Sequence, residues 1–165
     1  MRVYAIALLA LVVSMLVPVS AHAEGNRPIK ALGAELQVPE GWTRTASTIV
    51  KGAVTITETA DGSEPAVIEI FRGDSFENTE LEGLISQLPV EVSGQKARRL
   101  DWKDEVNRGF AVILDEADKT GTHLTLSFRG PLQRWKELKP VFATILANAA
   151  LTESTSGGLT FNAPK

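Results

Sequence analysis

Side chains able to take part in acid–base or metal chemistry gather in one short stretch of the chain, residues 115–123. Asp115, Glu116 and Asp118 precede His123, which is the only histidine after residue 23. A histidine close to carboxylates is able to act as a general base in hydrolysis, or to share a cation with them. The stretch lacks the D-x-D-x-D-G spacing of a calcium loop, so we expect a solvated acidic turn and leave cation binding open. We predict no metal ligand and no cofactor.

Other patterns that carry catalysis are missing from the sequence. The chain has no cysteine, which removes thiol nucleophiles and cysteine-bound zinc. It also has no G-x-S-x-G nucleophile elbow and no glycine-rich nucleotide-binding motif. A single histidine without an evident partner makes weak catalytic geometry. We therefore expect a protein that is not an enzyme and has no catalytic residue; a hydrolase that uses His123 is the least favoured alternative.

A basic and aromatic group is the most suggestive candidate for binding. Lys96, Arg98 and Trp102 stand at even positions of a predicted strand over residues 94–102, so they share one face of that strand. Arginine and tryptophan are favoured anchors of protein interfaces. These three residues, the basic ledge, would present a cationic and aromatic surface to an acidic protein partner. The alternative is a solvated face with Trp102 folded into the core.

The first residues predict where the protein works. Arg2 supplies a positive charge, residues 4–17 are apolar apart from Ser14, and small residues stand at positions 21 and 23. This pattern is typical of a secretory signal peptide over residues 1–23, cleaved between Ala23 and Glu24. The apolar run is shorter than the roughly 20 residues of a spanning helix. We therefore expect a periplasmic or secreted protein without stable membrane insertion after cleavage.

Charge and composition narrow the partners further. The full chain has a formal net charge of −3, and loss of Arg2 with the signal peptide makes it −4. A mildly acidic chain without a basic stripe is a poor candidate for binding nucleic acid, and anionic membranes repel it weakly. Its apolar fraction of 44% is ordinary for one globular domain held together by burial alone.

Alternation of polar and apolar residues predicts two hairpins in the middle of the chain. In residues 53–59, Val54 and Ile56 alternate with threonines, Asp61-Gly62 supplies a turn, and residues 66–71 form the returning strand. Residues 110–114 are apolar on both faces, as expected of a strand buried on both sides, and residues 124–129 alternate.

Helical periodicity predicts two helices. Residues 78–88 place four aliphatic residues at helical spacing, and Pro89 ends that segment. A second helix is expected to begin at Gly130-Pro131 and to carry an apolar stripe to Ala149, with a kink or break at Pro140. We therefore predict an α+β fold, with a mainly antiparallel sheet flanked by helices in an α/β/α sandwich.

The domain boundaries follow from composition. The polar, proline-containing residues 24–33 are expected to form an N-terminal arm, residues 34–151 a single domain, and the Ser/Thr/Gly-rich residues 152–165 a flexible tail.

The stretch LQVPEGW, residues 36–42, predicts a hairpin in which Pro39-Glu40-Gly41 forms the turn and Trp42 resumes the strand. Together with the two later hairpins, the helix expected between them and the closing helix, it resembles the PsbP/Mog1-like superfamily, which includes the bacterial DcrB-like proteins. The similarity covers residues 32–151, and the order of elements carries most of it. It implies a non-enzymatic accessory subunit, protein-binding factor or chaperone, by fold analogy.

The expected function is a non-catalytic periplasmic accessory or binding protein, chaperone-like or inhibitor-like, whose partner is another protein. The alternative is a carrier of an apolar small ligand, held between the sheet and the C-terminal helix. Trp135 and Phe142, in the apolar stripe of that helix, would then line the ligand site.

Overall fold

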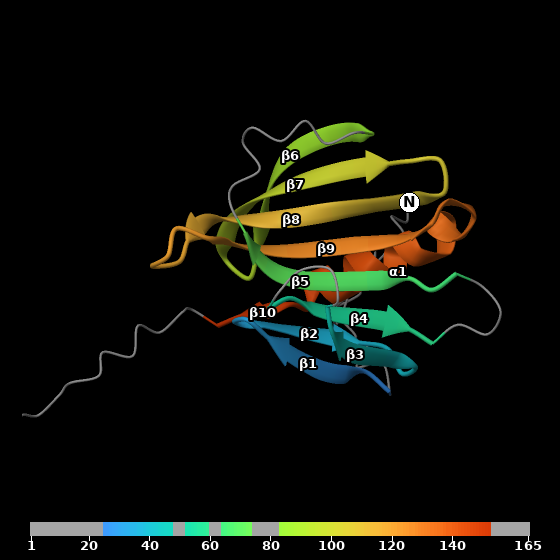
Figure 1. Cartoon of the computed structure of the whole chain (residues 1–165), viewed down its shortest axis with the longest axis horizontal. Helices are drawn as coiled ribbons and strands as arrows, with labels where there is room; N and C mark the ends of the chain where they lie inside the picture. Colours follow the sequence, from blue (N-terminus) through green and yellow to red (C-terminus); the bar gives the residue numbers. More distant parts are fainter. Residues whose placement is uncertain (1–24, 48–51, 60–63, 74–82, 153–165) are drawn as a thin grey trace, which may run out of the picture.

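The computed structural model describes residues 25–47, 52–59, 64–73 and 83–152, which form two antiparallel sheets and one α-helix (Figure 1). The larger sheet has the strand order β3-β4-β5-β9-β8-β7-β6, and the smaller one has the order β1-β2-β10. The helical part is a 3-10 turn η2 (Leu132–Arg134) followed by α1 (Trp135–Ala147). The strands are β1 (Arg27–Ala31), β2 (Ala34–Val38), β3 (Trp42–Ala46), β4 (Val54–Glu58), β5 (Val67–Gly73), β6 (Leu84–Val92), β7 (Gln95–Lys103), β8 (Asn107–Ala117), β9 (His123–Pro131) and β10 (Ala150–Leu151).

The two faces of the larger sheet follow from the alternation of its central strands. Ile68 pairs with Phe128, and Phe128 pairs with Phe110, so these buried side chains share one face. The helix α1 covers this face, where it packs against β9, and it also packs against β2 of the smaller sheet (Figure 1). The opposite face carries more polar residues, and among the described residues no helix covers it. The prediction of an α+β fold with a mainly antiparallel sheet is confirmed. The sequence also predicted helices on both faces of the sheet, whereas in the described residues the one α-helix covers one face.

Aromatic rings fill the space between the sheet and α1. Phe142 lies at the centre, with ring centroids 5.5 Å from Phe128, 6.0 Å from Trp135 and 6.2 Å from Trp42. All four side chains are buried. The apolar stripe that was considered as the lining of a carrier site is therefore part of the hydrophobic core.

Both hairpins predicted from alternation are confirmed. β4 pairs with β5, and β8 pairs with β9, each antiparallel. The strand predicted over residues 94–102 is β7. The predicted turn at Asp61-Gly62, the predicted signal peptide and residues 153–165 of the predicted tail lie outside the described residues.

The N-terminal part differs from the prediction in two ways. Residues 27–31, expected to belong to an arm, form β1, which pairs with β2. The LQVPEGW segment does turn at Gly41, whose φ is 87°, but β2 and β3 belong to different sheets. The segment is therefore a crossing between sheets, because β2 finds partners in β1 and β10 while β3 pairs with β4.

The helix predicted over residues 78–88 is wrong in its described part. Residues 84–92 form β6, an edge strand whose one partner among the described strands is β7. The helix was predicted because aliphatic residues at helical spacing usually form a buried stripe. In this segment they are exposed, so their spacing does not mark a face that packs on the core. Pro89 lies inside the strand, a position that sheets tolerate at an edge.

The C-terminal helix starts later than predicted. Pro131 ends β9 and precedes η2, so α1 begins at Trp135 and continues through Pro140 without a break between two helices there. Within the described residues, no helical segment has the length and apolarity needed to span a membrane.

Candidate functional site

The acidic turn between β8 and β9 is organised by Asp118. Its Oδ1 accepts hydrogen bonds from the backbone N–H groups of Thr120 and Thr122 and from the Thr120 hydroxyl, at 2.6–3.1 Å. Its Oδ2 accepts from the Thr122 hydroxyl at 2.9 Å and from Arg72 Nη1 at 3.2 Å. These bonds, led by that from the Thr120 hydroxyl, hold the pKa of Asp118 well below its usual range. Both oxygens of the Asp118 carboxylate are therefore occupied by hydrogen bonds, most of them within its own turn.

His123 does not join the acidic residues in a metal or catalytic group. Its ring Nδ1 lies 2.7 Å from the carbonyl oxygen of Leu114, a backbone atom of the neighbouring strand. Within the described ranges, no three side chains of the His, Cys, Asp or Glu type are placed to hold a metal ion together. The ring nitrogen that bonds to Leu114 is held by backbone, and the geometry gives no reason to assign His123 a catalytic role.

The two other acidic residues of this stretch, Asp115 and Glu116, lie on opposite faces of the sheet. Asp115 points to the face of the sheet away from α1, where its Oδ1 lies 3.7 Å from Arg98 Nε. Glu116 lies on the other side of β8 and borders a cleft. The sequence placed these two neighbours in one turn, but the strand alternation sends their carboxylates to opposite faces.

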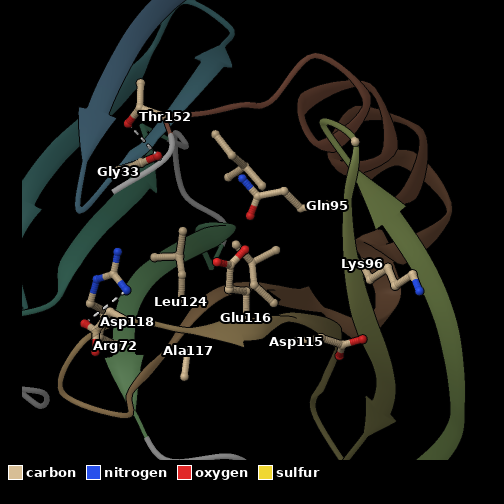
Figure 2. A pocket seen from close by; sticks show the side chains of 13 residues that line it. Gly33, Arg72, Gln95, Lys96, Asp115, Glu116, Ala117, Asp118, Leu124 and Thr152 are labelled. Atoms are coloured by element: carbon tan, nitrogen blue, oxygen red, sulfur yellow. Dashed lines mark hydrogen bonds and ion pairs between the residues drawn. The ribbon is translucent and has the colours of Figure 1, made fainter. Parts of the chain in front are cut away.

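The cleft has a volume of about 730 Å³ and lies near the C-terminal end of α1, where the two sheets meet (Figure 2). Buried Leu114 and Leu124 form part of its apolar lining. Side chains of Gln95 and Glu116 extend toward each other in it, whereas Lys96 and Asp115 point away (Figure 2). Its other lining residues are Gly33, Arg72, Gly94, Ala117, Asp118, Leu151 and Thr152.

Arg72 fixes one wall of the cleft. Besides its ion pair with Asp118, it donates from Nη2 to the carbonyl oxygen of Leu32 at 3.1 Å. Thr152 fixes the neighbouring wall, because its backbone N–H and its hydroxyl both donate to the carbonyl oxygen of Gly33, at 2.8 and 3.0 Å. The turn between β1 and β2 is therefore tied to both β5 and the residue that follows β10.

The basic ledge is partly assembled by the structure. Lys96, Arg98 and Trp102 lie on the face of β7 that points away from α1, as alternation predicted. Lys96 is exposed, Arg98 is half-buried beside Asp115, and Trp102 is half-buried with its ring over Gly109 of β8. The ledge is therefore neither fully solvated nor fully folded into the core.

An apolar group near the end of the ledge was missed by the sequence analysis. The large apolar side chains most exposed among the described residues are Leu84, Ile85, Leu88 and Val106, at 43–57% exposure. Leu84 pairs with Trp102, and Val106 lies in the turn after β7. We call Leu84, Ile85, Trp102 and Val106 the apolar corner. The helical assignment of residues 78–88 concealed it, and Pro89 was the signal for an edge strand.

These features define an α+β protein whose described residues form two antiparallel sheets and one covering α-helix. No protein-family model and no curated protein sequence matches the chain. Solved structures do match it. The chain is similar to cyanobacterial PsbP (CyanoP) from Synechocystis sp. PCC 6803, with 15% identity, a TM-score of 0.54 and coverage of 80% of this chain and 95% of that chain.

A second similar structure is LpqN of Mycobacterium tuberculosis, described as involved in cell envelope biogenesis. It shares 18% identity and a TM-score of 0.53 with this chain, and the match covers 79% of this chain and 87% of that one. At such identities the similarity concerns the fold. The chain shares the fold of cyanobacterial PsbP, which agrees with the fold that the resemblance of its sequence implied.

Proposed function

We propose that the mature chain is a non-catalytic accessory protein of the periplasm, or a secreted one, that binds another protein through the apolar corner. The observation that carries this proposal is the concentration of the exposed large apolar side chains on β6 and on the turn after β7. Contiguous exposed apolar groups on a soluble protein mark interaction sites, and tryptophan is enriched among the residues that dominate binding energy.

The basic ledge extends this surface along β7. Lys96 offers an exposed ammonium group, and the guanidinium of Arg98 reaches the same face at 3.7 Å from Asp115. An acidic partner would gain from these cations in encounter rate more than in final affinity. The proposed partner therefore combines an apolar contact for the corner with acidic residues for the ledge, whether the protein acts as a chaperone, an inhibitor or an accessory subunit.

The two alternatives have less support. The carrier hypothesis placed its ligand among the rings of Trp135 and Phe142, which are packed in the core. The hydrolase hypothesis depends on His123, whose Nδ1 faces a backbone carbonyl group.

Site-specific photo-crosslinking in the periplasm tests the proposal. A benzoylphenylalanine probe replaces Val106 in the corner, and a matched control probe replaces Thr57, on β4 far along the sheet order from β6. We expect a discrete adduct from the corner probe, lost on Leu84→Ser and weakened by Arg98→Glu. Equal adducts from both positions, or none, would contradict binding through the corner. The N-terminal sequence of the recovered protein tests cleavage before Glu24.

A further inference from the structure

The cleft between the two sheets carries an inference that is separate from the apolar corner. We propose that it is a binding site for a small organic cation, a primary ammonium group on a short aliphatic chain. Its volume of about 730 Å³ lies within the range of roughly 300–1,000 Å³ that is common for small-molecule sites. Such sites combine an apolar lining with a few convergent polar groups, and this cleft has both.

The charge of the cleft favours a cation. Asp118 is neutralised by Arg72 at 3.2 Å, and Asp115 is turned to the other face, where it meets Arg98. Glu116 has no hydrogen-bond or ion-pair partner among the described residues. The cleft therefore retains one negative charge that none of its own cations compensates, since Lys96 points away (Figure 2).

The polar groups converge on one point. Gln95 stands at the start of β7 and Glu116 near the end of β8, which is the neighbouring strand, and their side chains extend toward each other in the cleft (Figure 2). An ammonium group has three N–H donors and no acceptor, so it is able to donate to the Glu116 carboxylate and to the Gln95 amide oxygen at once. A neutral ligand would lack the charge-assisted bond to Glu116.

The apolar lining supplies the place for the aliphatic chain. Leu114 and Leu124 are buried and belong to neighbouring strands, and half-buried Leu151 of β10 also lines the cleft. An alkyl chain laid over these side chains removes apolar surface from water, which is favourable by roughly 25 cal/mol per Å² in small-molecule transfer. The bonds of Arg72 and Thr152 hold the walls in place before a ligand arrives. Preorganised walls lower the cost of binding.

The test is an NMR titration of the mature chain, labelled with ¹⁵N, with hexylammonium chloride. We expect shifts concentrated at the residues lining the cleft, and weaker binding at higher ionic strength because the contact is partly exposed. Equimolar 1-hexanol should cause much smaller shifts. A peptide with one central lysine forms a second arm, which distinguishes a free amine from a lysine side chain of a partner as the natural source of the ammonium group.

Two variants that each replace one glutamate with glutamine test the role of Glu116. Glu116→Gln removes the charge without changing the shape, and we expect affinity for hexylammonium to fall about fivefold, in line with the loss of one charge-assisted contact near the surface. Glu105→Gln, at an exposed site in the turn after β7, should leave affinity unchanged. Shifts scattered over the surface, equal effects of hexanol, or equal affinity of Glu116→Gln would overturn the proposal. Val106→Ser affects only the apolar corner, so the two proposals fail separately.

Discussion

Arg134 and Glu58 form a two-bond ion pair between η2 and β4. Nη1 of Arg134 lies 2.7 Å from Oε2 of Glu58, and Nη2 lies 2.9 Å from Oε1. Oε2 also accepts the backbone N–H of Ala66 at 3.2 Å. Both side chains are about three-quarters covered, so solvent screens this pair less than one on an open surface. The pair ties the start of the helical segment to the β4–β5 hairpin.

Arg134→Ala should lower the free energy of unfolding by about 1–3 kcal/mol, because it leaves the Glu58 carboxylate partly covered and without its main donor. Urea denaturation of the chain beginning at Glu24 measures the change. The matched control is Lys30→Ala, which removes an ion pair to Glu35 from a lysine that is 77% exposed. That control should change stability by less than about 0.5 kcal/mol. Similar small losses in both variants would show that the Arg134 pair does not stabilise the fold.

The same pair predicts a pH dependence. The hydrogen bonds from Arg134, opposed by partial burial, lower the pKa of Glu58 in the folded chain. Stability from this group is therefore present above the unfolded pKa of about 4.3 and is lost as pH falls through the lower folded pKa. Thermal melts between about pH 6 and pH 3 should show a steeper loss for the native chain than for Glu58→Gln. Parallel curves would contradict this linkage.

Gly109 is required by the close approach of its neighbours. A Cβ atom there would meet the carbonyl oxygen of Phe128 and would lie 2.8 Å from Cζ2 of Trp102. We expect Gly109→Ala to destabilise the chain by about 1–3 kcal/mol and to displace Trp102, seen as a changed tryptophan fluorescence maximum. Gly73→Ala is the control, because its nearest neighbour would be Phe71 at 3.7 Å, an ordinary contact. An unchanged Gly109→Ala protein would refute this account of the Trp102 site.

At the scale of elements, the edge strand β6 is protected by the placement of its proline. The N–H of Lys103 donates to the carbonyl oxygen of Gly83, so odd-numbered residues of β7 bond toward β6. Pro89 lies opposite Arg98, an even-numbered residue, so its nitrogen points to the free edge. Proline at an edge position removes a backbone N–H group that would otherwise donate a hydrogen bond to a strand of another chain.

Pro89→Thr should therefore promote self-association, since it restores an outward N–H on an edge that also exposes apolar side chains. Sedimentation velocity over a range of concentrations measures the shift from monomer to larger species. Ser86→Thr is the control, because Ser86 pairs with the odd-numbered Asp101 and its backbone bonds toward β7. The same association in both variants would assign the effect to threonine content and not to the free N–H.

For the molecule as a whole, Arg72 connects the two sheets at the cleft. It bonds to the carbonyl oxygen of Leu32, whose φ of 51° is unfavourable for a residue with a side chain, and to Asp118 in the β8–β9 turn. Backbone in such a conformation persists where its surroundings hold it. Among the described strands, the β1–β2 hairpin has the short β10 as its one further partner, so we expect it to depend on this contact more than the larger sheet does.

Arg72→Met keeps most of the side-chain volume and removes these bonds. We expect faster amide hydrogen exchange in residues 27–38 than in β8 and β9, and a melting temperature lower by several degrees, as about 1–2 kcal/mol gives in a domain of this size. Exchange that rises uniformly over the chain would show that Arg72 stabilises the whole fold and does not act as a local tie.

The local pattern of polar and apolar residues was sufficient to predict an element correctly where one face of that element is buried. Val54 and Ile56 face the core and the threonines between them do not, so alternation identified β4 correctly. The stripe of α1 was found for the same reason. In β6 both faces are largely exposed, so its residues carry no period of two and happened to match a helix.

The sequence by itself determined the α+β class, the two central hairpins, the C-terminal helix and the common face of Lys96, Arg98 and Trp102, because these depend on neighbours along the chain. Only the tertiary structure decided the separation of β2 from β3, the edge position of β6 and the cleft. The cleft gathers its lining from distant segments, of which Gly33, Arg72, Gln95, Glu116 and Leu151 are members. No short-range spacing encodes their meeting, since strand pairing between remote residues brings them together.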